Sequence, residues 1–91
     1  MIIYITAVHL SGGDKHEHIE SVRWENPTTK ETGESTKQAI IRWLEKDKTN
    51  EARVRNGASY VRVGVVKASP PYIRTYADGI WTDNLLALPR Y

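Results

Sequence analysis

The chain of 91 residues contains neither cysteine nor phenylalanine. The absence of cysteine excludes disulfides and thiolate chemistry, and it fits a protein of a reducing compartment. The absence of phenylalanine leaves three tryptophans and five tyrosines as the large aromatic residues. Each of these rings carries an N–H or O–H group, which we expect to find a hydrogen-bond partner or water.

The sequence also lacks the signs of a membrane span or a secretory signal. Its apolar opening, residues 1–8, is shorter than the ~18 residues that a span needs, and no basic residue precedes it. We interpret this stretch as a strand, and we expect a cytoplasmic protein without a membrane partner.

Acidic residues are missing from one long span. None occurs between Glu51 and Asp78, although the formal net charge of the whole chain is only +2. The span holds the basic residues Arg53, Arg55, Arg62, Lys67 and Arg74. A local bias of this kind informs about partners rather than about fold.

Length and composition predict one domain over residues 1–91. A chain this short supports one modest core, because a second core would leave both too small. A hydrophobic fraction of 40% and a charged fraction of 26% are ordinary for a folded globular protein.

One segment has the pattern of an amphipathic helix. Ser35 can cap its first turn, Gln38 three residues later completes a capping box, and the helix should end near residues 47–49. We expect Trp43 to pack in the core and Lys37 to point away from it. The apolar side of this helix carries Ala39, Ile40, Trp43 and Leu44, and its polar side Lys37, Arg42, Glu45 and Lys46.

Strand patterns flank this helix on both sides. They cover residues 2–9 and 18–25 before it, then a short segment around Val54 and residues 60–67, 72–77 and 80–81 after it. A bulge is expected near Ser21, and residues 26–34 should form a surface loop. The dipeptides Asn56-Gly57 and Asp78-Gly79 should occupy the central positions of two hairpin turns with positive φ. The predicted fold class is α+β, a mostly antiparallel sheet (order β-β-α-β-β-β) with one amphipathic helix packed on one face.

Alternation along the basic strands predicts a surface rich in arginine and tyrosine. If these strands are neighbours, one sheet face collects Arg53, Arg55, Tyr60, Arg62, Tyr72, Arg74 and Tyr76, opposite a row of valines. Such a face can stack bases and reach the phosphates of a single-stranded nucleic acid. It can also be the ordinary solvent-exposed face of an antiparallel sheet. A nucleic-acid site requires that the helix leave this face uncovered, a point on which the sequence is silent.

Two other groups of residues could carry chemistry. His16 and His18 follow His9 closely enough to suggest a metal site, but a solvated or hydrogen-bonded pair near a turn explains them better. Asp78 and Asp83 could act as paired carboxylates, but turn formation and capping account for both. No nucleophile stands at a recognised spacing from a base. We therefore expect no enzymatic activity, no metal and no cofactor.

Several segments together resemble a known family. They are Ile5–Val8, His16–Ile19, Val22–Trp24 and above all Tyr72–Gly79 with Trp81–Pro89. In these segments the chain resembles a family of short bacterial and phage-borne proteins catalogued as a domain of unknown function. The resemblance covers nearly the whole chain and implies a stand-alone cytoplasmic domain of a bacterium or its phage. It implies no activity, ligand or catalytic residue.

The leading interpretation is a small non-enzymatic module that binds another protein. Its contact surface is expected around Trp81 and Leu85 in residues 72–89, which we call the C-terminal block. The alternative is a single-stranded nucleic-acid binder that uses the arginine and tyrosine face. The oligomeric state is left open.

Overall fold

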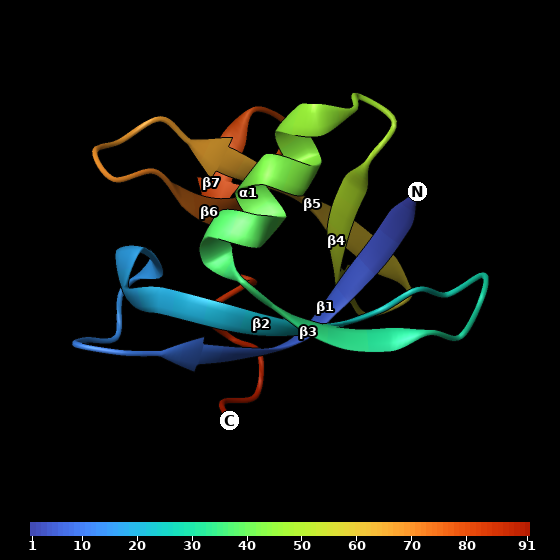
Figure 1. Cartoon of the computed structure of the whole chain (residues 1–91), viewed down its shortest axis with the longest axis horizontal. Helices are drawn as coiled ribbons and strands as arrows, with labels where there is room; N and C mark the ends of the chain where they lie inside the picture. The colour runs from blue at the N-terminus through green and yellow to red at the C-terminus, as the bar shows by residue number, and fades with distance from the viewer.

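The computed structural model describes all residues, 1–91, as a strongly twisted sheet with one helix on its inner side (Figure 1). The elements are β1 (Ile2–Leu10), the 3-10 turn η1 (His16–His18), β2 (Ile19–Glu25), β3 (Thr32–Thr36), α1 (Lys37–Lys46), β4 (Glu51–Asn56), β5 (Ser59–Val66), β6 (Tyr72–Ala77) and β7 (Ile80–Thr82). No helix is long and apolar enough to cross a membrane.

All strands belong to one sheet in the order β3-β2-β1-β4-β5-β6-β7. Every neighbouring pair is antiparallel except β1 and β4, which run parallel. Because parallel neighbours cannot be joined by a tight turn, the chain crosses from the β3 edge to the centre through α1. The predicted α+β class and mostly antiparallel sheet are confirmed.

The strand β3 is the main departure from the predicted order. Residues 32–34 were expected in a loop, but they pair with β2 as the first part of an edge strand. Backbone hydrogen bonds to one neighbour suffice for an edge strand, so its side chains need not be apolar. The loop prediction is therefore wrong for residues 32–34, and the order becomes β-β-β-α-β-β-β-β.

The pairing of β1 with β2 contains two register shifts, one of which was predicted from the sequence. His9 pairs with Ser21 and Leu10 with Ile19, so Glu20 is the extra residue of the bulge predicted near Ser21. A second register shift, between Ile5 and Ala7, was not predicted.

One of the two predicted dipeptides occupies the central positions of its hairpin turn, and the other does so only in part. Asp78 and Gly79 have φ values of 52° and 77° and join Ala77 to Ile80, as predicted. The other prediction is wrong by one residue, because Asn56 pairs with Ser59 and belongs to β4. The central positions of that turn are Gly57, with φ 64°, and Ala58. A glycine of positive φ at the first central position is typical of a type II′ turn.

The helix is capped by Thr36 and not by Ser35 as predicted. Thr36 Oγ1 accepts a hydrogen bond from Ala39 N at 3.2 Å, and the helix ends at Lys46, as expected. Lys37 was expected to point into solvent but is buried, with its Nζ 3.4 Å from the Glu17 carbonyl oxygen. This buried amine joins the start of α1 to η1.

The core lies between α1 and the inner face of the sheet. Trp43 packs against this core but remains half-buried, so the prediction of a core tryptophan holds in part. The buried hydrophobic residues that form one core cluster are Ile3, Ile5, Val8, Ile19, Val22, Ile40, Ile41, Ala52, Val54, Val61, Val63, Ile73 and Leu85. Burial of these side chains stabilises the packing of the helix on the sheet.

Candidate functional site on the helix-free sheet face

The helix covers the valine side of the basic strands. Val54, Val61 and Val63 are buried in the core beneath α1, while their neighbours Arg55, Tyr60 and Arg62 are exposed. Because successive side chains of a strand point to opposite faces, the arginines and tyrosines lie on the side without the helix. We call this side the helix-free face; its central residues are Tyr4, Glu51, Arg53, Arg55, Tyr60, Arg62, Gly64, Tyr76 and Trp81.

Guanidinium groups lie over tyrosine rings at three places on this face. Arg53 lies 3.9 Å from the ring centroid of Tyr60, and Arg55 lies 4.1 Å from that of Tyr4. Arg23 stands 4.1 Å over the ring of Tyr91, whose backbone hydrogen-bonds to β1. Cation–π contacts of this kind fix long arginine side chains in place. Tyr4 and Tyr91 were not among the predicted site residues. The sequence indicated only that Tyr4 lies in a strand and that Tyr91 is the last residue, and neither lies in the acid-free span.

Glu51 brings a negative charge into the middle of the arginines. Its Oε2 accepts a hydrogen bond from Arg53 Nε, and its Oε1 lies 3.1 Å from Arg62 Nη2. Contact with Tyr4 and, to a smaller extent, the bond to Glu51 raise the pKa of Arg53 above its ordinary value, so this arginine is charged at every accessible pH.

Two further cations of the acid-free span are compensated by acids outside it. Lys67 Nζ lies 2.7 Å from Glu45 of α1, and Arg74 Nη2 lies 2.9 Å from Asp83. Arg55 is the one basic residue of the span in no ion pair. The surface formed by this acid-free span therefore carries much less uncompensated positive charge than its sequence suggests.

Aromatic side chains continue the helix-free face toward β7. Tyr76 and Trp81 make an edge-to-face contact with ring centroids 5.6 Å apart. Both rings lie above Gly64, where an added Cβ would come within 2.9 Å of the Tyr76 ring. Tyr60 and Trp81 are each 41% exposed, and Tyr76 is half-buried. Partly exposed aromatic rings therefore accompany the arginines on the helix-free face, whereas Ile80 pairs with the core-packed Ala77 and lies on the other side of the sheet.

The structure separates Arg74 and Tyr72 from the other predicted residues. Both line a polar hollow of about 550 Å³ at the open edge of β6, together with Lys15, His16 and Asp83. Arg74 Nε donates to the Thr82 carbonyl oxygen at 3.2 Å, and its Nη2 holds Asp83. Strand pairing still places both residues on the predicted face, because Arg74 pairs with Gly64 and Tyr72 with Val66. Only the ends of their side chains depart from the group, and the ion pair with Asp83 holds the Arg74 guanidinium at the hollow.

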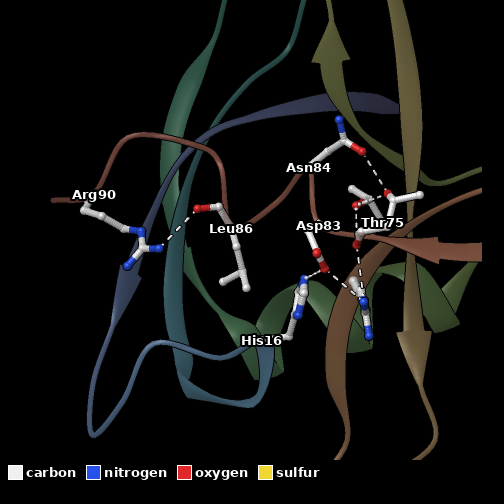
Figure 2. Close-up of polar contacts among 8 residues, drawn as sticks. His16, Thr75, Asp83, Asn84, Leu86 and Arg90 are labelled. Atoms are coloured by element: carbon white, nitrogen blue, oxygen red, sulfur yellow. Dashed lines mark hydrogen bonds and ion pairs between the residues drawn. The ribbon is translucent and has the colours of Figure 1, made fainter.

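His16 packs against this arginine–aspartate pair, as Figure 2 shows. Its Nε2 is buried without a hydrogen-bond partner and lies 3.8 Å from Asp83 Oδ1. Burial lowers the pKa of His16, the positive charge of Arg74 lowers it further, and Asp83 opposes both. The imidazole is therefore neutral at pH 7.

The three histidines point to three different places. His9 Nδ1 lies 2.5 Å from the Tyr91 carbonyl oxygen, and His18 Nδ1 accepts a hydrogen bond from Lys15 N at 3.2 Å. His16 faces Asp83. No group of three or more histidine and carboxylate side chains is arranged to hold a metal ion.

Leucine side chains of the C-terminal block pack in or against the core rather than on the surface. Leu85 was predicted as a contact residue, but it is 0% exposed and belongs to the core, so that prediction is wrong. The Thr75 hydroxyl donates to the Thr82 carbonyl oxygen at 3.1 Å, and the Thr82 hydroxyl donates to Asn84 Oδ1 at 2.8 Å (Figure 2). These bonds turn the chain so that Leu85 enters the core. Trp81 alone remains as a candidate contact residue of this block.

Comparison with known proteins agrees with this whole-chain architecture. The model of the family described as "Protein of unknown function (DUF3892)" matches residues 4–89. The chain belongs to the DUF3892 family. No curated protein and no solved structure matches it. The DUF3892 match spans β1 to the C-terminal turn, so the helix-free face lies within the family domain.

Proposed function

We propose that this DUF3892 domain is a non-enzymatic binding module and that its helix-free face contacts another protein. The observation that carries the proposal is the aromatic group formed by the exposed Tyr60 and Trp81 and the half-buried Tyr76, on the same face as the exposed Arg55 and Arg62. Tyrosine, tryptophan and arginine are the residues most enriched where proteins bind one another. Three stacked arginine–tyrosine pairs also reduce the side-chain entropy that binding would cost.

Charge compensation favours a protein over a nucleic acid as the partner. Glu51 offsets Arg53 and Arg62, and Asp83 offsets Arg74. A surface that must attract a phosphate backbone works through uncompensated cations, because counterion release supplies most of the affinity. A protein partner requires only shape and local charge complementarity.

A single-stranded nucleic acid is the second candidate. It is favoured by the uncovered position of the face, since stacking of bases needs open rings such as Tyr60 and Trp81. Arg55, which has no carboxylate partner, could reach a phosphate from the same surface.

The non-enzymatic part of the proposal is supported by the placement of the two candidate carboxylates. Asp78 has φ 52° in a hairpin turn, and Asp83 is paired with Arg74. Each aspartate thus has a structural role. A cytoplasmic location in a bacterium or phage-infected cell is part of the proposal, as the family resemblance implies.

Affinity capture from a cell lysate, with and without nuclease, tests the proposal. We expect one protein to be retained by the wild-type chain and by Arg42→Ala, whose site lies exposed on α1, and to be lost with Tyr60→Ser/Trp81→Ser. Retention that disappears after nuclease treatment would favour the second candidate. A partner retained equally by all three chains would exclude the helix-free face as its binding surface.

A further inference from the structure

Two of the three tryptophans line an apolar pocket on the opposite side of the sheet from the helix-free face. The pocket has a volume of about 240 Å³ and opens between α1 and the edge formed by β2 and β3. Its walls are Met1, Ile3, Trp24, Ser35, Ala39, Ile40 and Trp43. Both Trp24 and Trp43 are only half-buried, so each presents part of its indole ring to this space.

The Trp24 ring is held in position by two residues of β3. Gly33 lies directly beneath it, and a Cβ at Gly33 would come within 2.4 Å of the ring. The ring can therefore lie flat on the edge strand only because this position has no side chain. Trp24 Nε1 also donates a hydrogen bond to Ser35 Oγ at 3.0 Å. One wall of the pocket is thus preformed.

The lining determines the chemistry of an occupant. No acidic or basic side chain faces the pocket, and its one polar side chain, Ser35, already accepts from Trp24. The terminal ammonium of Met1 already bonds the Thr49 carbonyl oxygen and Asn50 Oδ1, so a charged group placed in the pocket would lose its hydration without gaining a free partner. An apolar ring would gain contact area with two indoles, for which offset or edge-to-face packing is favourable. An apolar cavity of roughly 150 Å³ suffices to bind benzene, so this volume accommodates a molecule of one or two rings.

We propose that this pocket, which we call the two-tryptophan pocket, binds a small, flat, uncharged aromatic molecule. The proposal is independent of the partner-binding face, because the two sites lie on opposite sides of the sheet and share no residue. An apolar side chain of a partner or of a second copy of this chain is the competing occupant.

Toluene and benzoate form a matched pair of probes, since they share a ring and differ in charge. Each is titrated into the full chain while the three indole N–H resonances are followed by NMR. We expect toluene to shift the Trp24 and Trp43 resonances in a saturable manner and to leave Trp81, on the helix-free face, unchanged. Benzoate should bind at least about tenfold more weakly, because its carboxylate would have to be desolvated.

Filling the pocket provides the control variant. Ala39→Leu adds apolar atoms from the helix side and keeps a residue of high helix propensity, so we expect a folded protein that has lost toluene binding. If this variant does not give a dispersed NMR spectrum, Ala39→Met fills the same space with a more adaptable side chain.

Three results would overturn the proposal. The first is the absence of saturable shifts up to the solubility limit of toluene. The second is toluene binding that survives in the filled variant, which would locate the probe elsewhere. The third is a concentration-dependent dimer that Ala39→Leu dissociates, since the pocket would then hold a second copy of the chain.

Discussion

Glu51 and Arg62 face each other across β4 and β5, with Glu51 Oε1 3.1 Å from Arg62 Nη2. The other carboxylate oxygen of Glu51 bonds Arg53, and the Glu51 side chain is only 18% exposed. The acid that precedes the basic span in the sequence is thus folded into its centre. Under the proposed function this relationship favours a protein partner, and it also indicates how the face could be made to attract nucleic acid.

Glu51→Gln should release two arginines and increase the attraction for nucleic acid. Retention of a mixed-sequence single-stranded oligonucleotide should rise at low salt, with a log–log salt dependence steeper by up to about 0.7 for each newly engaged phosphate. Glu45→Gln, which frees Lys67 on the helix side, is the matched control and should have a smaller effect. Equal retention by the wild type and Glu51→Gln would mean that Glu51 does not limit the charge of this face.

Leu85 and Trp81 should respond differently to truncation. Leu85→Ala empties a fully buried site and should lower the free energy of unfolding by about 2–5 kcal/mol. Trp81→Ala removes an exposed ring and should cost less than about 1 kcal/mol. Urea denaturation monitored by circular dichroism gives both values. A small cost for Leu85→Ala with a large one for Trp81→Ala would reverse the assignment of these residues to core and surface.

Gly64 should be required for the arrangement of the aromatic patch. Gly64→Ala places a Cβ within 2.9 Å of the Tyr76 ring and 3.4 Å of the Trp81 ring, so at least the Tyr76 ring has to move. We expect the Trp81 indole N–H resonance to shift and partner capture to weaken, while Trp24 and Trp43 keep their resonances. Gln38→Ala on the exposed side of α1 is the control. An unchanged Trp81 resonance would show that the patch is not packed on Gly64.

The stability of the protein should fall below neutral pH because of His16. Its pKa is lowered in the folded state by burial and by Arg74, so below pH about 6.5 the unfolded chain binds the proton more readily. Above that pH both states are neutral and His16 adds no pH dependence. Urea unfolding between pH 8 and pH 5 should therefore show a loss of stability that is smaller in His16→Gln.

His18→Gln is the control for this titration, because His18 lies apart from Arg74 and Asp83 on the other side of η1. It should follow the wild-type curve more closely than His16→Gln does. Superimposable curves for the wild type and His16→Gln would show that His16 does not cause the acid sensitivity.

The sequence predicted those helices and strands whose apolar side chains are buried in the core. Valine alternation in residues 60–67 depends on burial and was correctly interpreted. The apolar side of the helix was interpreted correctly only in part, because Ile41 and Lys37 are buried together with Ile40. The strand β3 carries Thr32, Gly33 and Glu34, whose roles are backbone pairing and support of the Trp24 ring. No hydrophobic period marks such an edge strand, which is why it read as a loop.

The candidate site was predicted in part for the same physical reason. Alternation correctly grouped Arg53, Arg55, Tyr60 and Arg62, because they share β4 and β5. It also gave the face of Arg74, which pairs with Gly64, but not the position of its guanidinium, which bonds Thr82 and Asp83 beyond its own strand. It also could not reveal that Glu51 compensates two arginines. The alternation of side chains along a strand predicts the sheet face from which a residue projects. It does not predict where the charged group of a long, flexible side chain lies.

Covalent labelling of tyrosine and tryptophan side chains, in the free protein and in its captured complex, tests the central claim most directly. If the helix-free face is the binding surface, Tyr60 and Trp81 will lose reactivity in the complex, while Trp43 of α1 will react as in the free protein. Protection of Trp43 with Tyr60 and Trp81 still reactive would contradict the claim and place the partner on the helix side.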